Sequence, residues 1–210
     1  MKPLDNPELE ARLQRLMDLG ERTIAALLFS IMAIRTIPSL VAKPANAIVL
    51  LSEGMVVLFM LIRRRPLDVT TRPLDWIAAV VATALPLTLR PGGATLGDVR
   101  LAATLGLCGL ILSIWAKLTL SRSFGMAAAN RGVVSGGPYR FVRHPMYAGY
   151  VLVDLSFVLL NPVPWNAFVV VVTFVCQVFR ILAEERILGR DPAYGVVAEA
   201  APYRIFPGIF

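Results

Sequence analysis

The sequence predicts an all-α, polytopic membrane protein, and its composition and its apolar runs carry that prediction. Of its 210 residues, 57% are hydrophobic and only 17% are charged, and the mean hydropathy is +0.68. Soluble domains contain roughly 25% charged residues. The chain also contains six apolar runs, most of which approach the roughly 20 residues that a helix needs to cross a bilayer. We therefore expect about six transmembrane helices in one integral membrane domain, residues 1–210.

The N-terminal segment predicts a helix that precedes the first span. Asn6–Glu8 is a helix start signal, because proline favours the first helical position. Leu9, Leu13, Leu16 and Met17 then recur at helical spacing, with charged residues on the other face. This pattern predicts an interfacial amphipathic helix, and a short solvated helix is the alternative. No apolar core of a signal peptide precedes it, so the first span is expected to stay in the mature protein.

The six apolar runs are separated by short polar or proline-containing segments. The runs are Thr23–Val41, Ala45–Ile62, Leu74–Leu89, Leu96–Leu120, Pro145–Leu160 and Trp165–Leu182. The third and fifth are the shortest, and a tilted or re-entrant course is open for them. The turn Asn161–Pro164 joins the last two runs, so these helices are expected to be antiparallel neighbours.

The positive charges predict the orientation in the membrane. With the N-terminus in the cytosol, only Lys43, Arg90 and Arg100 of the 21 lysines and arginines fall on the outer side, and Arg35 lies within the first run. The other seventeen are assigned to the cytosolic side, which predicts cytosolic N- and C-termini. The net charge of +7 is thus explained by topology. A nucleic-acid partner is not expected, because such a protein would carry its basic residues on a soluble face.

Three ionisable residues lie inside apolar runs. Arg35 and Glu53 are near the middles of the first two runs, and we expect them to pair, since an unpaired charge there costs roughly 3 kcal/mol or more. Asp154 is one helical heptad after Tyr147 and thus on about the same face. It is a candidate pocket residue, with an interhelical hydrogen bond as the alternative. Metal binding is not expected, since the chain has one histidine and both cysteines lie in apolar runs.

A polar, glycine-rich loop, Arg131–Tyr147, lies between two of the apolar runs and is the candidate site. Glycine permits close approach of a ligand to the backbone, and Arg143 with Arg180 can hold a carboxylate or phosphate by paired hydrogen bonds. Arg180 and Glu184 share a helical face, and Glu184 can accept hydrogen bonds from ribose hydroxyls or an ammonium group. Tyrosines that flank His144 offer aromatic faces for a nucleobase or a cation. Together these residues suit an amphiphilic cofactor that contains a nucleoside.

The C-terminal part of the chain resembles a known family. The segments GGPYRFVRHPMYAGY, LLNPVPWN, FRILAEERIL and YRIFPGIF resemble the isoprenylcysteine carboxyl methyltransferases, which are integral membrane methyltransferases, and their phospholipid methyltransferase relatives. The resemblance covers roughly residues 121–210, while residues 1–120 match only as hydrophobic helices. It implies that 121–210 form a cytosolic binding site for S-adenosylmethionine and that 1–120 form a helical membrane scaffold.

The resemblance also implies roles for individual residues. The residues at the positions of cofactor contacts are Arg131, Gly132, Val133, Val134, Tyr139, His144, Pro145, Met146, Tyr147 and Glu184. The first four would form a strand-like segment. Arg180 falls at a substrate-contacting arginine, Asp154 is the second candidate for substrate binding, and Arg143 and Arg180 are the candidate catalytic residues. The chain differs from its relatives at Val197, where they usually carry a tyrosine.

The predicted activity is transfer of the methyl group of S-adenosylmethionine to a membrane-embedded or lipophilic acceptor. In-line displacement at the methyl carbon mainly requires alignment and exclusion of water. An isoprenylcysteine-like carboxylate held by Arg180 is the leading acceptor, and a phospholipid amine or a thiol is the alternative. Two other functions stay open: an NADPH-dependent sterol-type reductase with a related C-terminal motif, and a non-enzymatic membrane protein that has kept the motif.

Overall fold

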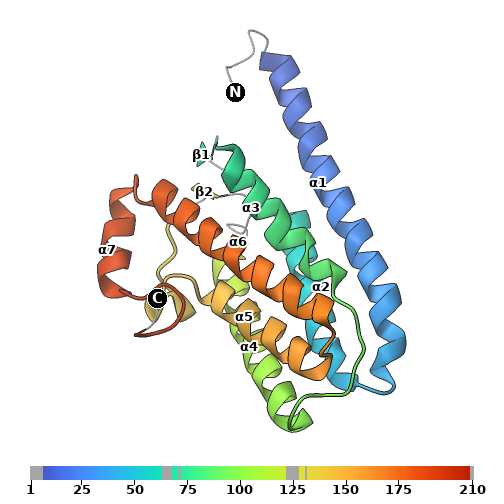
Figure 1. Cartoon of the computed structure of the whole chain (residues 1–210). Helices are drawn as coiled ribbons and strands as arrows, with labels where there is room; N and C mark the ends of the chain where they lie inside the picture. Colours follow the sequence, from blue (N-terminus) through green and yellow to red (C-terminus); the bar gives the residue numbers. More distant parts are fainter. Residues whose placement is uncertain (1–6, 63–67, 71, 122–127, 131, 209–210) are drawn as a thin grey trace.

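The computed structural model describes residues 7–62, 68–70, 72–121, 128–130 and 132–208 (Figure 1). The all-α prediction is confirmed. The α-helices are α1 Pro7–Thr36, α2 Ala47–Ile62, α3 Pro73–Ala84, α4 Val99–Leu120, α5 Pro145–Leu160, α6 Pro164–Leu188 and α7 Pro192–Ala200. Four short 3-10 helices, at Ile37–Leu40, Pro44–Asn46, Pro86–Thr88 and Gly137–Arg140, adjoin or connect them. Two antiparallel strands of two residues each, β1 Asp68–Val69 and β2 Ala129–Asn130, complete the described part.

Each of the six predicted apolar runs forms a helix. Four are long and apolar enough to cross a membrane, over Arg22–Leu40, Pro44–Ile62, Val99–Leu120 and Pro164–Leu188. The other two, Pro73–Thr88 and Pro145–Leu160, are shorter apolar helices. The polytopic helical class is therefore confirmed, with four helices of spanning length among the described residues.

The N-terminal segment is not a separate helix. α1 is continuous over 30 residues and includes both the predicted interfacial segment and most of the first span. It runs along one side of the molecule, drawn in blue in Figure 1. The physical reason is that no proline lies between Pro7 and Pro38, and the lone glycine, Gly20, costs a helix only about 1 kcal/mol.

Helices α4 and α5 approach closely enough to exclude side chains between them. A Cβ atom on Gly109 would lie 2.7 Å from the carbonyl oxygen of Gly149, and one on Gly149 would lie 2.7 Å from that of Gly109. The Ser156 hydroxyl donates to the Ala102 carbonyl oxygen across the same contact, at 2.7 Å. This packing holds the backbone of α5, which carries most of the candidate site, against α4.

Helix α6 lies beside both α5 and α3, as Figure 1 shows. The predicted antiparallel pairing of the last two runs is confirmed. At the turn between them, the Asn161 side chain donates to Asn46 Oδ1 at 2.7 Å, and the Asn166 side chain donates to the Arg90 carbonyl at 2.8 Å. These bonds link the segments that connect α1 to α2, α3 to α4 and α5 to α6, all at one end of the bundle. The candidate site lies at the other end of α5 and α6.

The predicted ion pair between Arg35 and Glu53 is wrong. Arg35 Nη2 instead donates to the Leu87 carbonyl oxygen at 2.9 Å. Glu53 is 6% exposed and interacts electrostatically with Lys117 of α4. Lys117, which the charge pattern places on the cytosolic side, has a completely buried side chain. The sequence does not reveal this burial, because it depends on the packing of α4 against α2.

Candidate functional site

The start of α5 and the end of α6 bring the predicted site residues together. Pro145 occupies the first turn of α5, where a missing N–H costs nothing. Helix α6 continues six residues beyond the predicted run, so Glu184 is held within its last two turns. The Tyr147 hydroxyl of α5 donates a hydrogen bond to Glu184 Oε1, and His144 Nδ1 lies 3.7 Å from Glu184 Oε2.

The neighbouring carboxylate, Glu185, has more partners than Glu184. Arg143 Nη1 lies 2.9 Å from Glu185 Oε1, and Arg204 Nε donates to Oε2 at 2.8 Å. His144 Nε2 lies 3.2 Å from Oε1. We call Arg143, His144, Glu185 and Arg204 the Glu185 cluster. The sequence reasoning assigned a role to Glu184 and missed that of Glu185, although adjacent helical residues face different directions and so meet different partners.

The C-terminal segment completes the Glu185 cluster. The backbone N–H of Arg143 donates to the Tyr203 carbonyl at 2.9 Å, and that of His144 donates to the Arg204 carbonyl at 2.7 Å. Arg143 Nη2 also donates to the Pro202 carbonyl at 2.9 Å. Helix α7, which sequence reasoning did not predict, leads into this segment and is capped by the Asp191 side chain, which accepts from the Ala193 N–H at 3.0 Å. The chain end is therefore fastened to the loop before α5.

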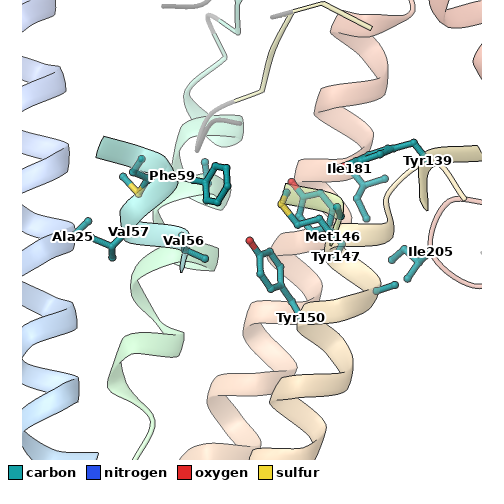
Figure 2. Packing of buried hydrophobic residues seen from close by; sticks show 14 residues of the cluster. Ala25, Val56, Val57, Phe59, Tyr139, Met146, Tyr147, Tyr150, Ile181 and Ile205 are labelled. Atoms are coloured by element: carbon teal, nitrogen blue, oxygen red, sulfur yellow. The ribbon is translucent and has the colours of Figure 1, made fainter. Parts of the chain in front are cut away.

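The aromatic residues of the site are buried rather than open. Tyr147 is 1% exposed, and the Arg180 guanidinium lies over its ring, 5.4 Å from the ring centre. Tyr150 meets Tyr147 edge-on, with 6.1 Å between ring centres, and projects toward α2 in Figure 2. Tyr139 is buried too, and this burial, reinforced by the Glu184 charge, raises the pKa of its hydroxyl well above the ordinary value. None of these three rings presents a free face for stacking.

A pocket lies directly beside these rings. It lies between α2, α3, α5 and α6. Its lining residues are Glu53, Val56, Met60, Ala82, Thr83, Pro86, Tyr150, Asp154, Gln177 and Arg180. Asp154 and Arg180, the two predicted substrate residues, thus line one pocket. Arg180 also contacts Tyr147, so the pocket adjoins the predicted cofactor residues.

The remaining predicted residues lie around the same region. Met146 and Tyr147 belong to the buried cluster shown in Figure 2, and Val134 packs against it. Pro145 is buried at the start of α5. The predicted strand-like segment is not a strand at Gly132, Val133 and Val134, which have no regular secondary structure. The short strand β2 instead lies before them, at Ala129–Asn130. Arg131 lies outside the described residues.

Glu184 is the part of the site that fits a nucleoside cofactor best. Its side chain is 21% exposed, and a carboxylate oriented by Tyr147 is a suitable acceptor for ribose hydroxyls. In the described part of the chain, no group of three or more histidine, cysteine, aspartate or glutamate side chains is placed to hold a metal ion. The chemistry of the described site therefore rests on carboxylates, guanidinium groups and phenols.

Comparison with known proteins places this region in context. Residues 99–194 match the family model described as phospholipid methyltransferase. The predicted resemblance to phospholipid methyltransferases is therefore confirmed for residues 99–194. The match runs from the first residue of α4 to Tyr194 of α7, so it includes the loop before α5, the pocket face of α5 and the end of α6. A search of curated proteins found no match to the chain.

Proposed function

We propose that the protein is a methyltransferase that transfers the methyl group of S-adenosylmethionine to a lipophilic acceptor. The observation that carries the proposal is the contact between two adjoining regions: the Tyr147–Glu184 pair at the end of α6 and the pocket lined by Arg180. Arg180 touches both, because its guanidinium lies over the Tyr147 ring while its side chain lines the pocket. A cofactor and an acceptor bound on either side of these side chains would be neighbours.

Glu184 would hold the ribose of the cofactor, and Tyr147 and His144 would orient this carboxylate. The Glu185 cluster fastens the C-terminal segment beside it, so this side of the site is held by the loop before α5, by α6 and by the C-terminal segment. When bound, S-adenosylmethionine supplies an electrophilic methyl group. The protein has to align the acceptor with it and exclude water. The burial of Tyr139, Tyr147 and Tyr150 suits that exclusion.

The acceptor would place its reactive group in the pocket and its apolar tail among the helices. Val56, Met60 and Ala82 supply apolar lining there. A carboxylate bound to Arg180 is one acceptor of this kind. A protic group such as an amine or a thiol is the second, because Glu53 and Asp154 line the same pocket and would repel a carboxylate.

Calorimetry on the purified full-length protein in detergent tests the cofactor assignment. S-adenosylhomocysteine and S-adenosylmethionine should bind and raise the melting temperature, since ligand at a hundred times its Kd stabilises by about 2.7 kcal/mol. NADPH should do neither, and Glu199→Gln, at an exposed position on α7, should bind like the wild type. Binding of NADPH with equal affinity would favour a reductase, and binding of neither would favour a non-enzymatic protein.

A further inference from the structure

The pocket contains two buried carboxylates that the proposed methyl transfer does not yet use. Glu53 on α2 is 6% exposed and Asp154 on α5 is 5% exposed, and both line the pocket beside Tyr150. Within the described part of the chain, neither carboxylate takes part in a hydrogen bond or a close ion pair. Burial of such a group without partners is costly, and a protein that keeps two of them needs a reason.

The cation that interacts with Glu53 is an equally unusual residue. The Lys117 side chain of α4 is completely buried, and its Nζ has no hydrogen-bond partner among the described residues. It lies 4.6 Å from the centre of the Tyr150 ring and interacts electrostatically with Glu53. Of the two carboxylates, Glu53 is therefore the one with Lys117 as its counter-charge.

This arrangement differs from that of a structural ion pair. A buried pair that stabilises a fold brings its charges into direct contact and satisfies their remaining hydrogen-bonding groups. Here Lys117 interacts with Glu53 without a hydrogen bond or close ion pair between them, and Glu53 lines the pocket. A carboxylate held in this way is available to a ligand.

We propose that Glu53 is the catalytic proton acceptor for a protic methyl acceptor bound in this pocket. This inference rests on the proposed methyltransferase function. The nucleophile, a neutral thiol or amine, forms a bond to the methyl carbon with its lone pair. The bond from that carbon to the sulfonium sulfur breaks, and its electron pair stays on sulfur. The proton of the nucleophile moves to Glu53. The sulfonium charge and the carboxylate charge disappear together, so the products leave the pocket neutral.

The test compares two acceptors with alkyl tails of nearly equal length in detergent micelles. Hexadecanethiol must lose a proton during methylation, whereas hexadecanethioic acid is already ionised at neutral pH and needs no base. Glu53→Gln should lower the rate with the thiol about 100-fold or more. The same variant should leave the rate with the thioacid unchanged or raise it, because it removes a negative charge that would repel the anionic acceptor. It should leave the affinity for S-adenosylhomocysteine unchanged. Glu53→Asp, which keeps a base, should recover part of the thiol rate.

Ser52→Ala is the matched control, because Ser52 is the neighbouring residue of α2 and is completely buried. It should leave both rates unchanged. If Glu53→Gln does not fold, Glu53→Asp carries the same comparison with a smaller difference between the acceptors. An equal loss with both acceptors, no loss with either, or a wild type that methylates only the thioacid or neither would overturn the role of Glu53. Failure of the wild type to bind S-adenosylhomocysteine would instead overturn the proposed function.

Discussion

Glu185 and Glu53 are both poorly exposed carboxylates close to the candidate site, but their surroundings differ. Glu185 has three cationic or protonatable partners, Arg143, His144 and Arg204, within 3.2 Å. Among the cations of the described residues, Glu53 interacts with Lys117 alone, without a close ion pair, and it lines a pocket. A charge with many partners fixes the positions of the segments that supply them, whereas a charge with few is free to meet a ligand. The comparison indicates that the Glu185 cluster holds segments of the site in position, an architectural role, and that the pocket binds a ligand and takes part in the reaction.

The comparison predicts the largest loss of stability at Glu185. Glu185→Ala removes the shared partner of two arginines and a histidine and leaves them close together without a counter-charge. We expect the free energy of unfolding to fall by about 3 kcal/mol, as for other buried pairs that lose one member. Thermal unfolding in detergent measures the change, with Glu199→Ala on exposed α7 as the control. A loss at Glu185 no larger than at Glu199 would remove the architectural role from this cluster.

The second prediction concerns the contact that positions the pocket face of α5. Gly109→Ala should destabilise the protein by about 2 kcal/mol, because the new Cβ would lie 2.7 Å from a backbone oxygen of α5. Gly195→Ala on α7 meets no atom within 4 Å and should be neutral or slightly stabilising. Equal melting temperatures for the two variants would show that α4 and α5 can separate without cost.

The third prediction divides the roles of Glu184 and Arg180. Glu184→Gln keeps the shape but loses the charge, so the affinity for S-adenosylhomocysteine should fall by about 2 kcal/mol. Arg180→Lys keeps the charge but loses the planar guanidinium over the Tyr147 ring, so the cofactor should still bind while methyl transfer falls. Arg180 and Glu184 also interact electrostatically. If both changes weaken cofactor binding equally, the two residues act as one structural pair.

The sequence allowed the fold to be predicted better than the site. Helix α5 has the predicted bounds, because Pro145 and the Asn161 turn delimit an apolar run without ambiguity. The contacts of Lys117 could not be predicted, since nothing in the sequence tells a snorkelling lysine from one that is buried beside a carboxylate 64 positions earlier. The hydrogen bond between Arg204 and Glu185 could not be predicted either, because it depends on how α7 reverses the direction of the chain. Periodicity predicts which residues share a helix face, and the contacts between helices come only from the packing.

The smallest expected effect lies at the edge of the Glu185 cluster, in Tyr194 of α7. Burial, with the Glu185 charge nearby, raises the pKa of Tyr194 to about 12. In the unfolded chain this hydroxyl would ionise near pH 10. Between these two values the unfolded state binds fewer protons than the folded state, so stability should fall as the pH rises from about 10 to 12. Tyr194→Phe removes that hydroxyl, and its melting temperature should fall less steeply over this range than that of the wild type. Tyr203→Phe, at a residue 40% exposed, should keep the wild-type slope. If Tyr194→Phe follows the wild-type curve instead, α7 is not held against the Glu185 cluster. The cluster would then fix the C-terminal segment only through the bond from Arg204.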